Sequence, residues 1–566
     1  MKWRSLLGLD AQDAFDFGQG DQPIFGGDAI QPQSGSPPSA ADTPVPNPVD
    51  DPGFRIFFED NTGRVINYDG EVIGIGNGND YVYVGPRNEG LQIGDNNFAL
   101  MFGEVNDQVR LGNDNVDFLL GSYNRDTLVG DNNRGVLNGI VNGAVAIGHG
   151  NNLELNGYEN DVSMAGDSNN ARMIGVDNHA TVEGNYNFVD ITGIWNDVYM
   201  QGDGNATYAD GVVNNAAVVG NYNFTQLSAW VNHALVMGDG NGTVAESYGG
   251  LNQVDVYGNF NYSFLDGGEN HAVTVGDYNV TSMFGEVNDH LGIGNGNVDT
   301  LRGFDNRETV IGDYNFTDVR GVWNDIYAQG DGNVTHADGF INNATVGGNY
   351  NFTELSAWVN RATVVGDGNV TVAEAQDGFN QVDVYGNNNF SVLDAGAYGV
   401  NVAHTEGQGN VTEAYGALNI LSGGSGDNTL IGMGGHSELK GGAGNDTLIN
   451  DGSSATLNGG SGNNDLVGNP WGEDTFHIDW NEITGPSRTT DLIQNYTPGQ
   501  DHLEIGLPSG QSLDLTRTVD LLVQGMASFG GSPFGGGGSD LHLQIGQVDL
   551  VVAPPLAHDD GWMLKG

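Results

Sequence analysis

The sequence repeats itself with a period of nine residues, and this period restricts the fold more than any other feature. The unit is G-x-x-N followed by five residues, as in Gly202-Asp-Gly-Asn205 and Gly211-Val-Val-Asn214. It keeps register from Gly76 to Gly238 and, after a two-residue insertion, from Gly249 to Gly366. A fixed period of this kind is typical of a solenoid, in which each repeat stacks on its neighbours.

Two classes of quartet alternate, so the complete unit has eighteen residues. One class is small and polar, such as Gly202-Asp-Gly-Asn205, and the other is often apolar, such as Gly193-Ile-Trp-Asn196. In the five-residue segments the second and fourth places hold small or β-branched residues, which alternation puts on one face of a short strand. The glycine and asparagine content excludes helix.

The quartets themselves predict how the coils turn and stack. Glycine gives the backbone the freedom that a tight corner needs. The asparagine at the fourth place should lie on the asparagine of the next coil, where the amides can form a hydrogen-bonded ladder. We therefore predict an all-β fold, a parallel β-roll or β-solenoid with eighteen-residue coils.

The domain organisation follows from shifts in composition and period. A leader rich in Pro, Ser, Asp and Ala is expected to be a flexible linker, and a short segment with an Asn-Thr-Gly turn reads as a hairpin that caps the roll. Part of the roll is duplicated at an offset of 128 residues. The predicted parts are 1–53 (leader), 54–72 (hairpin cap), 73–420 (nonapeptide roll, with 184–268 repeated as 312–396), 421–476 (a second kind of roll) and 477–566 (closing and export region).

Composition and charge exclude several classes of function. The 566 residues include no cysteine, which excludes disulfides and thiol chemistry. The net charge is -56, so nucleic acid is excluded as a partner because phosphate binding needs a basic surface. A chain this acidic suits an exterior rich in salt or divalent cations. We expect no membrane span and no N-terminal signal peptide, because the first apolar run is short and ends at Asp10.

From Gly423 the repeat changes to G-G-x-G-x-D-x-U-x, where U is a large apolar residue. Copies begin at Gly423, Gly441 and Gly459. Here the sequence resembles the repeats-in-toxin family of haemolysin-type calcium-binding proteins. In that family, turn carbonyls and the sixth-place Asp form an all-oxygen calcium cage. The resemblance implies calcium as cofactor, on one side of the roll, with these ligand positions: Gly424, Gly426, Asn428, Gly442, Gly444, Asp446 and Asn464.

Only Asp446 keeps the acid of that motif. The G-x-x-N nonapeptide of the long roll can be aligned with the G-G-x-G-x-D nonapeptide from the leading glycine of each. In this alignment the long roll carries Ala, Thr or Val where the family has its calcium aspartate. Sixth-place acids then remain at Asp117, Asp126, Asp299 and Glu308. A buried acid without a partner is costly, so a bound cation or a local distortion is expected there.

The C-terminal region resembles the end of proteins exported by type I systems. Trp471 to Ile478 and Asp491 to Ile505 are similar to the segment that closes such calcium rolls. In the family the uncleaved export signal lies in the tail. The resemblance implies a type I exporter as a partner and an extracellular, secreted or cell-surface location.

The apolar quartets predict a contact surface. If both residues between Gly and Asn lie outside the corner, the apolar quartets stack into a ridge that drives self-association or docking on a cell surface or polysaccharide. The alternative is that these side chains fold back over the thin core. The expected contact residues are Trp195, Trp230, Trp323, Phe340 and Trp358.

These features favour a secreted, calcium-binding, non-catalytic protein with a structural, biofilm-matrix or adhesive role. The first alternative is a secreted polysaccharide-modifying enzyme with paired carboxylates on a strand face. A further alternative is an ice- or mineral-binding surface, which needs outward threonines. Alternation points the repeated threonines, such as Thr207 and Thr225, inward.

Overall fold

The computed structural model describes residues 55–58, 65–67, 70–529 and 541–553. The predicted leader over 1–53 lies outside the described residues. The chain divides into two compact units, residues 1–290 and 291–566, and each is described by itself.

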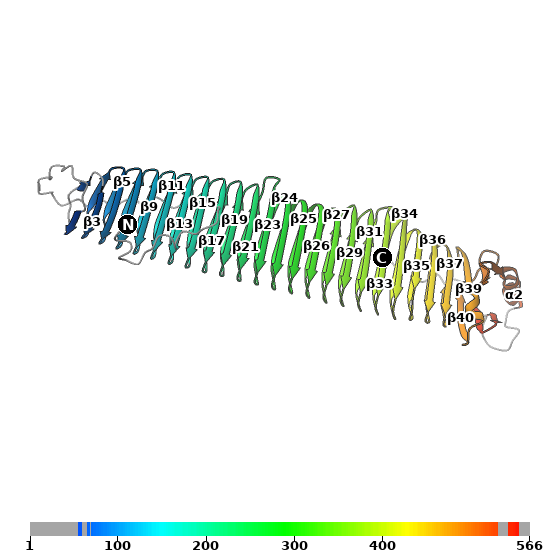
Figure 1. The fold of residues 1–566 in the computed structure, drawn as a ribbon. Coiled ribbons are helices and arrows are strands. Elements are labelled where there is room, and N and C mark those ends of the chain that lie inside the picture. The colour runs from blue at the N-terminus through cyan, green and yellow to red at the C-terminus, as the bar shows by residue number, and fades with distance from the viewer. Residues whose placement is uncertain (1–54, 59–64, 68–69, 530–540, 554–566) are drawn as a thin grey trace. The chain divides into compact units, whose positions relative to one another are not determined.

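The predicted fold class is confirmed. The structure is 67% strand and 3% helix, with parallel β-solenoid coils of about 18 residues. Each strand pairs in parallel with the strand one coil later, as β15 (Asp177–Glu183) does with β17 (Trp195–Gln201) and β17 does with β19 (Val213–Val219). Within a unit, successive coils therefore lie side by side (Figure 1).

The strands of the first unit are short and evenly spaced. They are β1 (Arg55–Phe58), β2 (Val65–Asn67), β3 (Gly70–Ile75), β4 (Asp80–Val84), β5 (Arg87–Ile93), β6 (Phe98–Phe102), β7 (Val105–Leu111), β8 (Val116–Leu120), β9 (Tyr123–Val129), β10 (Arg134–Asn138), β11 (Val141–Ile147), β12 (Asn152–Asn156), β13 (Glu159–Ala165), β14 (Asn170–Ile174), β15, β16 (Phe188–Thr192), β17, β18 (Ala206–Asp210), β19, β20 (Phe224–Ser228), β21 (Val231–Met237), β22 (Gly242–Glu246), β23 (Leu251–Tyr257), β24 (Tyr262–Val275) and β25 (Val280–Ile293), which contains the division between the units.

The second unit continues the pattern and ends in a mixed region with two helices. Its elements are β26 (Val298–Ile311), β27 (Phe316–Gln329), β28 (Val334–Asp338), β29 (Ile341–Gly347), β30 (Phe352–Ser356), β31 (Val359–Val365), β32 (Val370–Glu374), β33 (Phe379–Tyr385), β34 (Phe390–Glu406), β35 (Val411–Gly423), β36 (Thr429–Ala443), β37 (Thr447–Ser461), β38 (Asp465–Val467), β39 (Glu473–Asp479), α1 (Trp480–Ile483), β40 (Thr489–Gln494), β41 (His502–Gly506), β42 (Ser512–Asp514), α2 (Thr516–Phe529), β43 (Leu541–Ile545) and β44 (Val548–Val552).

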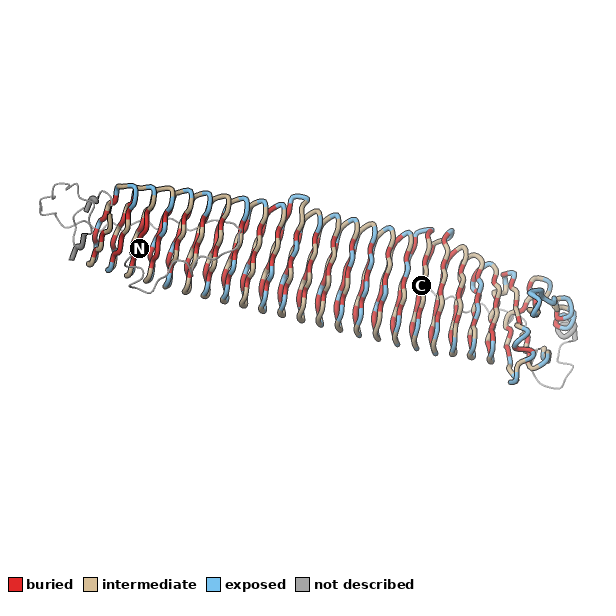
Figure 2. The backbone as a smooth tube through the Cα atoms, viewed as in Figure 1, coloured by how far each residue is buried: buried red, intermediate tan, exposed pale blue. Residues whose placement is uncertain are grey.

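The core is a thin layer of inward side chains between the two strands of each coil. Burial alternates along most strands of the coils, as it does in β19, where Ala216 and Val218 are buried and their neighbours are partly exposed (Figure 2). Thr207 and Thr225 are also buried, as predicted. These threonines therefore form no outward array of the kind that an ice-binding surface needs.

Asparagine ladders hold the corners, as the repeat predicts. At one corner the side-chain amides bond directly, with Asn106 Nδ2 donating to Asn124 Oδ1 at 2.8 Å and Asn124 Nδ2 to Asn142 Oδ1 at 2.8 Å. At the other corner the backbone N–H donates instead, as from Asn97 to Asn115 Oδ1 at 2.9 Å. Every such bond spans one coil, so the ladders fix the register.

The prediction of a hairpin cap over 54–72 is wrong. β1 pairs in parallel with β3, and β2 pairs in parallel with β4, so the two described strands at the start of this segment stack on the roll as coil strands do. A Gly/Asn turn between two apolar runs signals a hairpin and a solenoid corner alike. The distinguishing feature is the offset: Ile56 faces Ile73 and Val65 faces Tyr81, which is close to one coil.

Coil stacking also continues unbroken where the repeat changes at 421. β35, β36 and β37 pair in parallel along their length, so the calcium motifs extend the same roll. At the C-terminal end, antiparallel pairs β41–β42 and β43–β44 replace the coils. Among the described residues, no helix has the length and apolar character to cross a membrane.

Candidate functional sites

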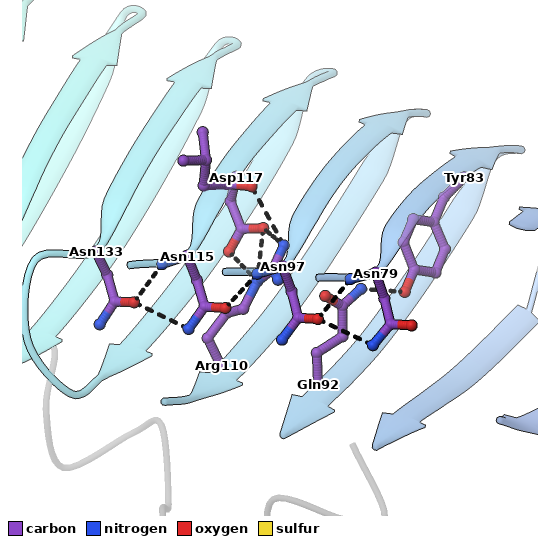
Figure 3. A network of polar contacts seen from close by, with 9 residues as sticks. Asn79, Tyr83, Gln92, Asn97, Arg110, Asn115, Asp117 and Asn133 are labelled. Atoms are coloured by element: carbon purple, nitrogen blue, oxygen red, sulfur yellow. Dashed lines mark hydrogen bonds and ion pairs between the residues drawn. The ribbon is translucent and has the colours of Figure 1, made fainter. Parts of the chain in front are cut away.

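The core of the first coils contains a buried polar network beside apolar side chains such as Met101 and Leu119 (Figure 3). Arg110 on β7 and Asp117 on β8 face each other across the interior, and both side chains are fully buried. Arg110 Nε donates to the Asp117 carboxylate oxygens at 2.8 and 2.9 Å. Nearby, Gln92 Nε2 donates to the Tyr83 hydroxyl at 3.0 Å.

Asp126 lies in the same core. Burial raises the pKa of Asp126 well above its usual value, and the negative charge of Asp117 raises it further. Burial and the charge of Asp117 thus favour the uncharged form of Asp126, while Arg110 and Asp117 form a buried ion pair. Gly135 makes room for this group, because a Cβ there would lie 2.5 Å from Asp126 Oδ2.

Arg110 is the charge partner of Asp117, whereas the expectation of a cation or a distortion at Asp126 stays a prediction. Arg110 lies on the opposite strand of the coil, seven residues before Asp117, and so it is not at the eighteen-residue repeat distance. Asp299 and Glu308, in the second unit, are likewise buried. The polar network in the first coils is thus an internal structural feature.

The calcium motifs enter the roll in a register that differs from the sequence superposition. The Gly407 N–H donates to the Ser425 carbonyl, and Val411 pairs with Thr429. The sixth-place Asn428 therefore stands one coil after Asn410, the fourth-place residue of its quartet. The alignment of the two nonapeptides on their leading glycines was therefore wrong by two residues. The fourth-place Asn of the long roll and the sixth-place residue of the G-G-x-G-x-D motif occupy the same corner of the coil. In the long roll the calcium aspartate corresponds to asparagine, and not to Ala, Thr or Val.

The predicted ligands Asn428, Asp446 and Asn464 do come together as one column. The Asn428 N–H donates to Asp446 Oδ1 at 2.8 Å, and the Asp446 N–H donates to Asn464 Oδ1 at 3.0 Å. Gly424, Gly426, Gly442 and Gly444 form the adjoining turns, where Asn428 Nδ2 donates to the Gly426 carbonyl at 2.9 Å. Burial raises the pKa of Asp446 to about 6.

Three buried oxygens of this column are of the type that hard cations bind. Asn428 Oδ1, Asp446 Oδ2 and Asp491 Oδ2 are buried and have no hydrogen-bond partner among the described residues. A Cβ on Gly441 would lie 2.5 Å from Asp446 Oδ2, so the first glycine of the motif leaves space for the carboxylate. Oxygen donors that lack hydrogen-bond donors are what calcium coordination requires.

Sequence reasoning missed Asp491 as a member of this column. It follows Asn464 across an interval of 27 residues, and its Oδ1 accepts hydrogen bonds from the Asn464 N–H and Nδ2. The interval departs from the period because α1 and its loop lie in between. Asp491 is followed by Leu and Ile, which matches the D-x-U part of the G-G-x-G-x-D-x-U-x motif. Only this pattern could have identified Asp491 from the sequence.

The first unit carries the predicted apolar ridge on one corner. Its tryptophans are exposed, with Trp230 at 59%, so these side chains do not fold back over the core. Backbone bonds stack the members coil upon coil, such as from the Tyr158 N–H to the Ile140 carbonyl at 2.8 Å. Ile140 and Tyr158 extend the ridge beyond the predicted residues. The ridge of the first unit comprises Ile140, Tyr158, Val176, Ile194, Trp195, Val212 and Trp230.

The second unit carries an equivalent ridge. It comprises Phe304, Val322, Trp323, Phe340 and Trp358. The Phe304 ring lies 6.1 Å from that of Trp323 and joins the ridge. Half of each large ring is exposed, as for Phe340 at 51%.

A shallow groove follows one outer strand face of the first unit. Asp161, His179 and Asp197 occupy equivalent places in successive coils. A hollow of about 600 Å³ includes Asp161, and one of about 280 Å³ includes Asp197. Burial raises the pKa of each of these two carboxyls to about 7.

Comparison of the chain with protein-family models, with curated proteins and with solved structures finds no match. What can be said of function therefore comes from the geometry of the column at Asp446, the two ridges and the groove.

Proposed function

We propose that this protein is a secreted, non-catalytic structural protein that acts in an extracellular matrix or in adhesion. The apolar ridge carries the proposal. A contiguous row of exposed Trp, Tyr, Ile and Val on a chain with net charge -56 is costly to hydrate, and such rows mark contact sites. About half of each large ridge side chain is exposed, so burying the remainder requires a partner.

The partner proposed for the ridge is a second copy of this chain. Each unit has its own ridge, so one protein offers two equivalent surfaces to its neighbours. Two chains of this charge repel each other, and salt or divalent cations must screen that repulsion before the ridges meet. Association is therefore expected to begin outside the cell.

Calcium binding and type I export complete the proposal. The column at Asn428, Asp446, Asn464 and Asp491 supplies oxygens suited to one or two calcium ions. Bound calcium would neutralise the buried Asp446 carboxylate and order the last coils. If the last coils become ordered only after export, the cell interior must be poor in calcium and the exterior rich in it. A type I exporter connects these two compartments.

Sedimentation of the full-length protein, with negative-stain imaging, tests the ridge. The wild-type protein is expected to form dimers or filaments in calcium. Replacing tryptophan by serine at four ridge positions should leave a monomer with an unchanged melting temperature; the positions are Trp195, Trp230, Trp323 and Trp358. Trp471→Ser is the matched control, because Trp471 is 80% exposed and lies outside both ridges. A monomeric wild-type protein at every concentration would overturn the proposal, and so would a quadruple variant that still associates.

A second candidate function, polysaccharide hydrolysis, rests on the groove. Asp161 and Asp197 lie two strand spacings apart, about 9.6 Å, which is near the upper end of carboxylate separations in inverting glycosidases, roughly 6.5–9.5 Å. A carboxyl whose pKa is about 7 can act as a general acid near neutral pH. Release of reducing sugar by the wild-type protein, abolished in Asp161→Asn, would favour this candidate over the structural one.

A further inference from the structure

The corner opposite the ridge holds a second row of aromatic side chains. In each coil the third residue of the polar quartet adopts a left-handed backbone conformation. Glycine, asparagine, aspartate or serine occupies this place in many coils, as at Asn132, Ser168 and Gly204. In other coils it is aromatic; these residues are Tyr186, Tyr222, Phe260 and Tyr278 in the first unit and Tyr314 and Tyr350 in the second.

An aromatic residue is an uncommon choice for this conformation. Tyr222 has φ of 58°, where glycine or asparagine is favoured. Core burial does not offset the strain, because the Tyr222 side chain is 76% exposed. Strain that is retained on an exposed side chain points to a role of that side chain at the surface.

Four of the tyrosine rings each lie over a glycine of the next coil. A Cβ on Gly204 would lie 2.8 Å from Cδ1 and Cε1 of Tyr186, and Gly240 stands in the same relation to Tyr222. In the second unit, Gly332 and Gly368 lie under Tyr314 and Tyr350. The absence of a side chain below allows the ring to lie along the corner with its outer face exposed.

The alternation of tyrosine and glycine sets the spacing of the rings. Tyr186, Tyr222 and Phe260 follow one another at every second coil, because Gly204 and Gly240 stand between them. Two strand spacings amount to about 9.6 Å. Phe260 and Tyr278 occupy adjacent coils, and their rings stack at 5.2 Å. From Tyr186 to Phe260 the row therefore offers flat rings at an interval of two coils, and Tyr278 adds a ring in the adjacent coil.

The surroundings of the rings are acidic and rich in hydrogen-bond acceptors. Asp203 and Asp239 are exposed beside the row, and one oxygen of each accepts a backbone N–H of the next coil at 2.7 Å. Anionic chains are repelled by such an edge. In contrast to the ridge, the row contains no aliphatic side chain, which favours a ligand that stacks over a protein partner that packs.

We infer that this tyrosine row is a stacking platform for an extended, neutral β-1,4-linked polysaccharide of the cellulose or chitin type. Successive sugars in such a chain are turned over, so the same face recurs at every second sugar, as the rings recur at every second coil. The apolar face of a pyranose rests on an aromatic ring, and the flanking carboxylates accept hydrogen bonds from its hydroxyls. The inference deepens the proposed adhesive function by naming its ligand, and it uses a surface separate from the ridges.

Retention of the full-length protein on insoluble glycans tests the inference. The probes are microcrystalline cellulose, chitin, starch granules as an α-linked control, and alginate as an anionic control. The six aromatic residues of the row are replaced together by asparagine, which the left-handed conformation accepts, so the variant should melt at the same or a higher temperature. Asn132→Gly and Ser168→Asn are matched controls in the same row.

The wild-type protein should bind cellulose or chitin even in high salt, and the sixfold variant should bind at least about tenfold more weakly. Whichever of the two glycans is retained identifies the source. Gly204→Ala and Gly240→Ala should lift the rings and weaken binding with Tyr186 and Tyr222 in place. Equal binding by the sixfold variant, or no retention on either β-linked glycan, would overturn the inference. The tryptophan-to-serine ridge variant distinguishes the two proposals, because it should keep glycan binding while losing self-association.

Discussion

Asp446 Oδ1 accepts the backbone N–H of Asn428 at 2.8 Å. Asn369 Oδ1 accepts the backbone N–H of Asn351 in the same way, also at 2.8 Å. A carboxylate thus stands in the place of an amide within an otherwise uniform column. The bond that stacks the coils is retained, while Nδ2 is replaced by a second oxygen. The calcium motif is therefore a small chemical change to a corner that the whole roll uses.

This relationship predicts opposite effects of calcium on the wild-type protein and on Asp446→Asn. Without calcium, the variant should melt at the same or a higher temperature, because it no longer buries an acid whose pKa is raised to about 6. Calcium at about 100 times its Kd should stabilise the wild-type protein by about 2.7 kcal/mol and leave the variant unchanged. Calorimetry with and without calcium measures both. Asp427→Asn is the control, since it removes an adjacent acid outside the column; a calcium response that survives in Asp446→Asn contradicts the assignment.

The buried pair in the first unit predicts a large cost for a single substitution and a small cost for a double one. Asp117→Ala leaves the Arg110 guanidinium buried without its partner and should lower the free energy of unfolding by about 3–5 kcal/mol. Arg110→Met with Asp117→Leu removes both charges and should restore most of that loss. Denaturant unfolding of the first unit checks this. Glu154→Ala, which breaks the exposed pair with Arg134, should change stability by less than about 1 kcal/mol.

The raised pKa values of Asp161, Asp190 and Asp197 predict the pH dependence of the first unit. Each is raised to about 7, chiefly by burial, so the folded state holds these protons more tightly than the unfolded state. Their contribution is complete at acidic pH and is lost as pH rises through about 7. The melting temperature should fall as pH rises from about 4 to about 7 and should level off above that. Asp161→Asn with Asp197→Asn should flatten this dependence, and an unchanged slope would argue against the burial of these groups.

Export predicts a difference between the two ends of the chain. Removing residues 507–566 should retain the protein in the producing cell, whereas removing residues 1–50 should leave secretion intact. Immunoblots of cell and medium fractions measure the outcome. Removing only residues 554–566 separates the tail from the folded C-terminal cap, which includes α2. Secretion that survives the loss of 507–566 excludes a C-terminal signal.

Much of the fold could be predicted from the sequence because one coil determines the next. The Asn106–Asn124 amide bond and the burial of Ala216 and Val218 follow directly from the period. The exposed ridge at Trp195 and Trp230 was also predictable, since no inward place remained for these side chains.

The errors arose where two structures share one local signal. The turn before Val65 suits a hairpin and a corner equally, and only its pairing with Tyr81 shows which one forms. The two-residue offset of the calcium motif was hidden because both quartets begin with glycine. The Arg110–Asp117 pair joins strands within a coil, so a search at the repeat period does not find it. The row at Tyr222 was missed because a single sequence place there accepts Gly, Asn and Tyr.

The ladder bonds have a consequence for how a protein of this kind changes in length. Each Asn amide reaches only one coil away, from Asn124 to Asn142 and from Asn142 to Asn160. Recombination that removes or inserts whole coils leaves every remaining amide with a neighbour of the same kind, so the new junction needs no compensating substitution. The copy at an offset of 128 residues, which equals seven coils and one two-residue insertion, is such an event preserved in the chain. The length of such a roll can thus change in increments of one coil, independently of the chemistry on either edge.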